Sequence, residues 1–202
     1  MKYIKLFLAS SAELARERDI VGALFSEINT AIHGRDVFLL LYKWENLNPS
    51  FTDERKQSDY EHKIDNADLF VALFFRREAG YTVEEGEYAR GLIAKRKDRS
   101  GEPTTGKASG KSGGKLSGQS GKDLKAHCYF KAADERSFKV ADYKNKLGAD
   151  FAFGEYAHES DINAVLARII SPVLVKHGIE VVEENGVMSF NGKKVLKLKV
   201  ES

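Results

Sequence analysis

Apolar and polar positions along this chain follow two periods in alternation, one typical of buried strands and one typical of amphipathic helices. Nearly continuous apolar runs predict strands at Tyr3–Leu8, Val37–Tyr42, Leu69–Phe75 and His127–Lys131. Apolar residues spaced by three and four positions predict helices between these runs, and a strongly amphipathic helix at Asp161–Lys176. A short charged helix is expected at Arg55–Asp65, and a short strand or turn at residues 151–153. Strands that are apolar on both faces and alternate with helices indicate a parallel sheet covered on both sides. The pattern therefore predicts an α/β domain over residues 1–176.

Two segments depart from this pattern. Residues 100–122 are rich in glycine, serine and lysine and contain no core-forming cluster, which predicts a flexible insertion. Gly101–Lys107 within it approaches a phosphate-binding loop, but the position that would ligate Mg²⁺ is alanine and no strand precedes it. Residues 177–202 carry Asn-Gly pairs between short alternating stretches, at Asn185-Gly186 and Asn191-Gly192, which predicts a small antiparallel β extension.

Composition restricts the classes of function further. The net charge of +2 arises largely in the lysine-rich segment, so we expect no nucleic-acid partner. The longest apolar runs are too short to span a bilayer, so we expect no membrane partner. A single cysteine rules out an internal disulfide and suits a reducing compartment, so we expect a cytoplasmic location. The single cysteine, Cys128, lies in an apolar strand and is interpreted as an inert buried thiol. The histidines are scattered, and no metal site is expected.

Candidate site residues come from the carboxyl ends of the strands, where α/β folds bind ligands. Three glutamates in four residues stand at the start of the helix expected at Val83–Arg96. Glu84 and Glu87 are expected to face solvent, whereas Glu85 falls on the apolar face. Thr82 and Glu85 also fit a capping box, as Ser10 and Glu13 do at the first helix. Glu85 is thus either a helix cap or a site residue.

The order of these elements, and four stretches of sequence, resemble a bacterial TIR domain of the kind related to nucleoside 2-deoxyribosyltransferases. The stretches are LFLASSAEL, LLYKWENL, RKQSDYEHKIDNADLFVALF and YTVEEGEYA. The resemblance implies a flavodoxin-like parallel sheet with helices on both faces. It also implies a catalytic glutamate four residues after an aromatic residue, and that spacing falls on Tyr81 and Glu85. By the same likeness Ser10, Ser11, Trp44 and Glu45 match substrate-contacting positions, with tyrosine at 81 in place of the usual tryptophan.

The activity implied by the resemblance is cleavage of the nicotinamide–ribose bond of NAD⁺, with NAD⁺ as substrate and no cofactor. The products would be nicotinamide and ADP-ribose or a cyclic variant, in bacterial anti-phage signalling. The family's enzymes complete their sites by self-association, so we expect contacts between copies of this chain. Two alternatives stay open: an inactive TIR-like interaction module, and a deoxyribosyltransferase that acts on free nucleosides.

Overall fold

The computed structural model describes residues 1–43, 53–77, 80–100, 124–147 and 152–198. Its main sheet has five parallel strands in the order β2-β1-β3-β4-β5. The strands are β1 (Lys2–Ser10), β2 (Val37–Lys43), β3 (Leu69–Phe74), β4 (Lys125–Lys131) and β5 (Ala152–Tyr156). This is the strand order of the flavodoxin-like fold, as expected from the sequence.

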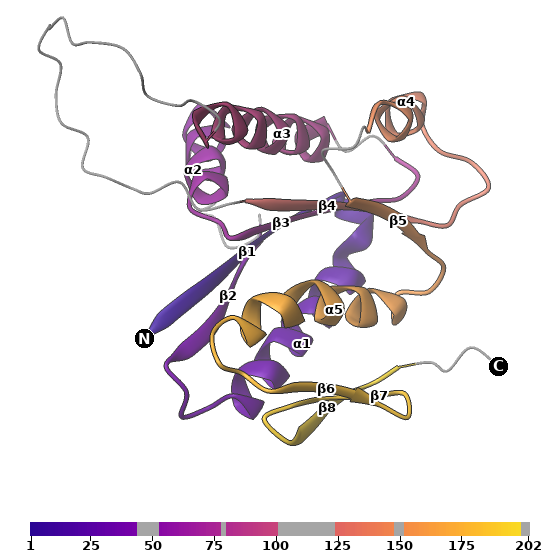
Figure 1. The fold of residues 1–202 in the computed structure, drawn as a ribbon. Helices are drawn as coiled ribbons and strands as arrows, with labels where there is room; N and C mark the ends of the chain where they lie inside the picture. Colours follow the sequence, from indigo (N-terminus) through magenta and orange to yellow (C-terminus); the bar gives the residue numbers. More distant parts are fainter. Residues whose placement is uncertain (44–52, 78–79, 101–123, 148–151, 199–202) are drawn as a thin grey trace, which may run out of the picture.

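Helices cover both faces of the sheet (Figure 1). One face carries α2 (Asp53–Asp65), α3 (Gly80–Ser100) and α4 (Phe138–Lys146), and the other carries α1 (Ala15–Ala31) and α5 (Asp161–Val175). A short 3₁₀ helix, η1 (Ala12–Leu14), leads from β1 into α1. The layers arise because apolar residues line both faces of the inner strands, so that each face needs its own cover.

Strand β1 shows how the sequence divides between the two faces. Alternate side chains point to opposite sides of a strand. Ile4, Leu6 and Leu8 accordingly belong to the core beneath α1 and α5, whereas Phe7 and Ala9 belong to the core beneath α2, α3 and α4. Strand β3 lies between β1 and β4, and all six of its residues are buried. It is the centre of both cores.

A second, antiparallel sheet follows α5. Its strands are β6 (Val181–Glu184), β7 (Val187–Phe190) and β8 (Lys193–Lys197). Both predicted Asn-Gly turns are confirmed, since Asn185, Gly186, Asn191 and Gly192 all have positive φ, as two-residue hairpin loops require. Met188 and Phe190 from β7 join the core formed by α1 and α5, so the extension packs against the α/β domain (Figure 1).

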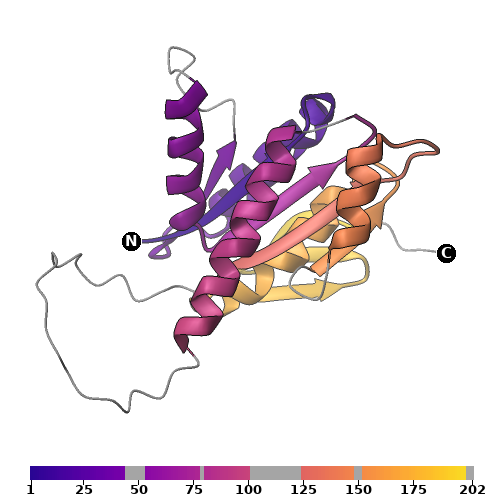
Figure 2. The ribbon, with the colours of Figure 1, turned by 90° about the horizontal axis from the view of Figure 1, so that it is seen from above.

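The carboxyl ends of the strands define the edge where a ligand would bind. Ser10, the last residue of β1, pairs in register with Leu73 near the end of β3. The chain leaves β1 toward α1 on one face and leaves β3 toward α3 on the other (Figure 2). These two adjacent strands therefore form the switch point at which flavodoxin-like folds bind ligands. Trp44 and Glu45, which follow β2, lie outside the described residues.

Candidate functional site

Glu85 lies on the buried face of α3, one helical turn before Ala89 and two before Ile93. Its exposed fraction is 5%, against 0% for Ala89 and 8% for Ile93. Burial in this environment raises the pKa of the Glu85 carboxyl to about 8, and the neighbouring charge of Glu84 adds to the rise. Among the described residues, none forms a hydrogen bond or an ion pair with the Glu85 carboxyl. A carboxyl in such a position is costly for folding.

The other two glutamates lie as the helical pattern predicts. Glu84 is exposed. Glu87 is partly exposed and forms an ion pair with Arg90, with 2.8 Å between its Oε2 and the arginine Nη2. Of the three acidic residues, only Glu85 lacks a solvent-facing position.

The capping-box interpretation of Glu85 is wrong. Helix α3 begins at Gly80, so Thr82 lies inside the first turn and is not its N-cap. The buried face explains the earlier start, because Thr82, Glu85, Ala89 and Ile93 follow one another at helical spacing and are all buried. Thr82 belongs to that face and has to be helical. The helix therefore begins before Thr82 and the glutamates that fit a capping box in the sequence.

The capping box predicted at Ser10 and Glu13 does not form either. Ser11 is the N-cap of η1, and its side chain makes no capping hydrogen bond. Instead, Oε1 of Glu13 accepts hydrogen bonds from the backbone amides of Arg76 at 2.8 Å and Arg77 at 2.9 Å. The Glu13 carboxylate thus links the loop after β1 to the loop after β3, across the switch point.

Ser10 and Ser11 lie at the carboxyl edge as predicted and are both buried, with exposed fractions of 7% and 6%. A guanidinium nitrogen of Arg18, Nη1, donates to Ser10 Oγ at 3.1 Å and to the Ser11 carbonyl at 2.7 Å. Arg18 itself is 2% exposed. A buried guanidinium therefore holds the loop after β1 in place.

An ion pair between Glu17 and Lys131 also lies at this edge, next to the ring of Phe75. The Glu17 carboxylate is buried and accepts from Lys131 Nζ at 2.7 Å. Lys131 Nζ and the Arg76 guanidinium each lie 5.0 Å from the centroid of the Phe75 ring. Sequence reasoning missed this group, because Glu17 has the spacing of a polar helix residue and Lys131 lies more than a hundred positions away.

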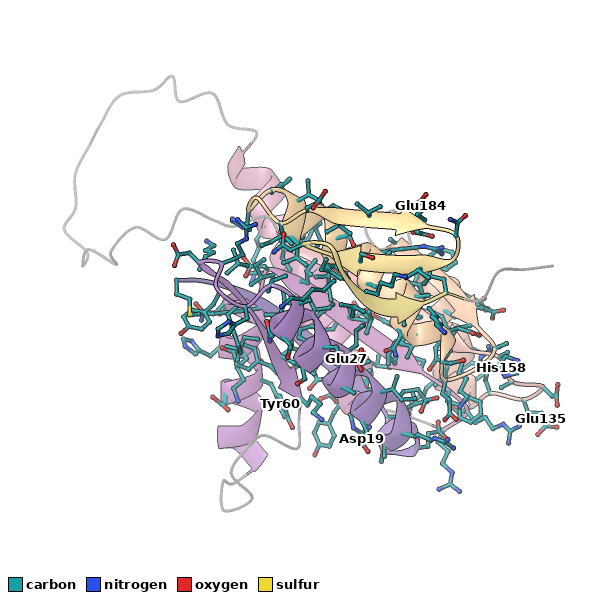
Figure 3. All side chains as sticks on the ribbon, turned by 90° about the horizontal axis from the view of Figure 1, so that it is seen from below. Asp19, Glu27, Tyr60, Glu135, His158 and Glu184 are labelled. Atoms are coloured by element: carbon teal, nitrogen blue, oxygen red, sulfur yellow. The ribbon has the colours of Figure 1, made fainter. Side chains whose placement is uncertain are left out.

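A polar pocket adjoins Lys131 at the ends of β4 and β5. Its volume is about 380 Å³, and it is lined by Lys131, Ala157, His158, Glu159 and Ser160. Glu159 forms an ion pair with Arg16 at 3.1 Å. Figure 3 labels His158 and Glu135 at this end of the molecule. Tyr156 is buried and precedes the pocket in the chain, and its hydroxyl has no hydrogen-bond partner among the residues that the structure describes.

The other residues singled out in the sequence are Tyr81, Trp44, Glu45 and Cys128. Tyr81 is in the first turn of α3 and is 64% exposed, so it does not pack with Glu85 in the core. Trp44 and Glu45 lie outside the described residues. Cys128 is confirmed as a buried thiol, and burial raises its pKa to about 12, which disfavours the reactive thiolate. Within the described parts of the chain, no three histidine, cysteine or acidic side chains form a metal-binding group.

No protein-family model matches the chain, and no curated protein does. Two solved structures are similar over most of its length. One is the metal-soaked Flv1 flavodiiron core from Synechocystis sp. PCC6803, at 8% identity and a TM-score of 0.37, covering 85% of this chain. The chain spans 36% of that protein. The other is the azoreductase from Bacillus anthracis str. Sterne, at 11% identity and a TM-score of 0.34, covering 88% of this chain and 97% of that one.

Among the described residues, no helix is long and apolar enough to cross a membrane. The assignment to the flavodoxin-like class follows from the strand order and the two helical layers.

Proposed function

We propose that this chain is a TIR-like enzyme that cleaves the nicotinamide–ribose bond of NAD⁺, with Glu85 as the catalytic carboxylate. The observation that carries the proposal is the position of Glu85. It is a buried carboxyl with a raised pKa, without a partner among the described residues, on the helix that follows the central strand β3. Strongly perturbed carboxyls of this kind concentrate at functional sites.

The chemistry of the substrate suits one such carboxyl. Nicotinamide leaves as a neutral molecule from a cationic precursor, so the reaction needs no general acid. The bond breaks toward an oxocarbenium-like state, and a nearby carboxylate stabilises the developing positive charge. The cationic nicotinamide ring would itself lower the pKa of Glu85 on binding and favour the ionised carboxylate.

The other proposed residues have supporting roles. Ser10 and Ser11 would contact the substrate from the β1 edge, and Tyr81, Trp44 and Glu45 would form outer contacts. Because Tyr81 is exposed on α3, it is available to a neighbouring copy of the chain or to a bound nicotinamide ring. We propose that self-association completes the site, in the cytoplasm and in an anti-phage signalling role, with ADP-ribose or a cyclic variant as product.

An assay with two substrates and a control without substrate, over a range of protein concentrations, tests this proposal. The chain is incubated with NAD⁺, with free deoxynucleosides plus an acceptor base, and with neither. Release of nicotinamide that rises more steeply than protein concentration supports the proposal. Base exchange without nicotinamide release would favour the deoxyribosyltransferase. Absence of both reactions at the highest concentration would leave an interaction module.

A further inference from the structure

The amides of Arg76 and Arg77 form an arrangement that binds anions. Two successive backbone N–H groups point at one carboxylate oxygen, Oε1 of Glu13, at 2.8 and 2.9 Å. Successive amides that converge in this way make concavities that accept phosphate as readily as carboxylate. In the structure the chain's own glutamate fills this position.

The surroundings of these amides favour an anionic ligand. The side chains of Arg76 and Arg77 are both exposed. The Arg76 guanidinium lies over Phe75, and no ion pair joins it to another described residue. Lys131 lies over the same ring from the β4 side, with its charge balanced by the buried Glu17. The two residues that supply the amides therefore also carry exposed arginine side chains, which can reach an anionic ligand from solvent.

The location is also suitable for a ligand. The amide pair follows β3 directly, at the switch point between the carboxyl ends of β1 and β3. The same loop leads into α3, which carries Glu85. Glu13 reaches the amides from η1, and its Oε1 also accepts a long hydrogen bond from the Ser11 hydroxyl at 3.4 Å. The Ser11 side chain does not cap the helix, so Glu13 can rotate away at the loss of this one side-chain contact and without breaking a helix cap.

We propose that the Arg76 and Arg77 amides and guanidinium groups form a diphosphate subsite, which the Glu13 carboxylate occupies when no ligand is bound. Glu13 is then an internal competitor that a diphosphate displaces. This subsite rests on the proposed function in one respect, since it would hold the diphosphate of NAD⁺ while the ribose lies toward Glu85. Binding of a diphosphate can be measured without any cleavage.

The test measures binding of ADP by calorimetry and the amide resonances of Arg76 and Arg77 by NMR. In Glu13→Ala the competitor is gone, so the affinity for ADP should rise about tenfold over that of the wild type. Glu13→Gln keeps a neutral acceptor and should give a smaller rise. Glu27→Ala is the matched control, because Glu27 is an exposed glutamate on α1 and its loss changes the net charge equally (Figure 3).

In the double variant Arg76→Ala/Arg77→Ala, ADP binding should be lost. Unchanged or weaker ADP binding in both Glu13 variants would show that Glu13 only braces the loop, and would overturn the proposal. So would an absence of ADP-induced shifts at the two amides. If ADP binds as expected but NAD⁺ is not cleaved, the subsite stands and the proposed activity fails. If NAD⁺ is cleaved without any effect of these variants, only the subsite fails.

Discussion

At the scale of single residues, the burial of Glu85 makes the stability of the chain depend on pH. Its pKa rises from 4.5 to about 8 on folding. Below the lower value the carboxyl is neutral in both states and has no effect. Between the two values the unfolded chain releases the proton while the folded chain keeps it, so the free energy of unfolding falls as the pH rises. Above about 8 the penalty is constant.

This gives a prediction for Glu85→Gln, which removes the charge and keeps the shape. The variant should be more stable than the wild type at pH 8, by on the order of 3 kcal/mol. Near pH 4 the two should have equal stability. Thermal unfolding of both proteins from pH 4 to pH 9 measures the difference. A difference in stability that does not change with pH would show that folding does not raise the pKa of Glu85.

The same pKa predicts the pH dependence of the proposed reaction. The profile of kcat/KM reports the pKa of the essential group in the free enzyme. If Glu85 acts as a carboxylate, kcat/KM for NAD⁺ should rise with pH and level off above about 8, the pKa given by its burial. A profile that is flat between pH 6 and pH 9 would contradict the claim that catalysis needs the Glu85 carboxylate with a pKa of about 8.

At the scale of elements, the packing of α3 against α4 depends on a glycine next to Glu85. A Cβ added to Gly86 would lie 2.2 Å from the hydroxyl oxygen of Tyr143. Tyr143 comes from α4, is buried, and packs against Phe74 at the end of β3 with 5.2 Å between ring centroids. The contact therefore sets how closely α3 and α4 approach each other near Gly86.

Gly86→Ala should force α3 and α4 apart and destabilise the chain by about 1–3 kcal/mol, in spite of the better helix propensity of alanine. Gly91 is the matched control, since it lies in the same helix and a Cβ there would meet no atom within 4 Å. Gly91→Ala should be neutral or stabilising by up to about 1 kcal/mol. Chemical denaturation measures the free energy of unfolding of both variants. Equal changes in the two would show that the helix accommodates a methyl group at position 86.

A second contact between elements joins α1 to β4 through Glu17 and Lys131. Lys131→Met keeps much of the side-chain volume but leaves the Glu17 carboxylate buried without its cation. Loss of one partner of a buried pair costs about 3 kcal/mol or more. The double variant Glu17→Gln/Lys131→Met, which leaves no unpaired charge, should recover most of that loss. Denaturation curves of the wild type, Glu17→Gln, Lys131→Met and the double variant give the coupling energy. A double variant no more stable than Lys131→Met would contradict the prediction.

At the scale of the whole molecule, the hydrophobic pattern predicts most of the fold. Strands β1 to β4, helices α1, α2 and α5, and both Asn-Gly turns follow from local periodicity and turn chemistry. The prediction is less accurate for the region before α5. Only a short strand or turn is expected there, at residues 151–153, whereas the structure has a five-residue strand, β5, at Ala152–Tyr156. It lies at the edge of the sheet and is largely exposed, so it lacks the apolar run of an inner strand.

The candidate site is only partly predictable. The burial of Glu85 follows from its place on a helical wheel. The Glu13 contact with the Arg76 and Arg77 amides, and the Glu17–Lys131 pair, join residues that are far apart in the chain. A local capping motif competes with such contacts for the same side chains, and at Glu13 the distant amides prevail. Nothing in one sequence shows which partner is preferred.

The insertion gives a prediction for the molecule as a whole. Helix α3 continues to Ser100, so the deletion begins after it, at Gly101, and ends at Lys122. Replacing these residues with a short glycine-serine linker should change the stability by less than about 1 kcal/mol, because loop-closure entropy depends only weakly on loop length. Denaturation measures this directly. A loss of several kcal/mol would show that the segment packs against the domain.

The central claim is that Glu85 supplies catalytic charge, and its most direct measurement compares three single substitutions. Glu84→Gln, Glu85→Gln and Glu87→Gln each remove one negative charge from the same two turns of α3. Glu84 is exposed and Glu87 forms a surface ion pair with Arg90, so these two variants should keep near wild-type activity and stability.

Nicotinamide release from NAD⁺ is measured for all three variants at the same high protein concentration, together with their melting temperatures at pH 8. We expect Glu85→Gln to melt at or above the wild-type temperature and to lose activity by about two orders of magnitude or more, as loss of one charge-stabilising group does. Equal rates of NAD⁺ cleavage in the three folded variants would contradict this expectation.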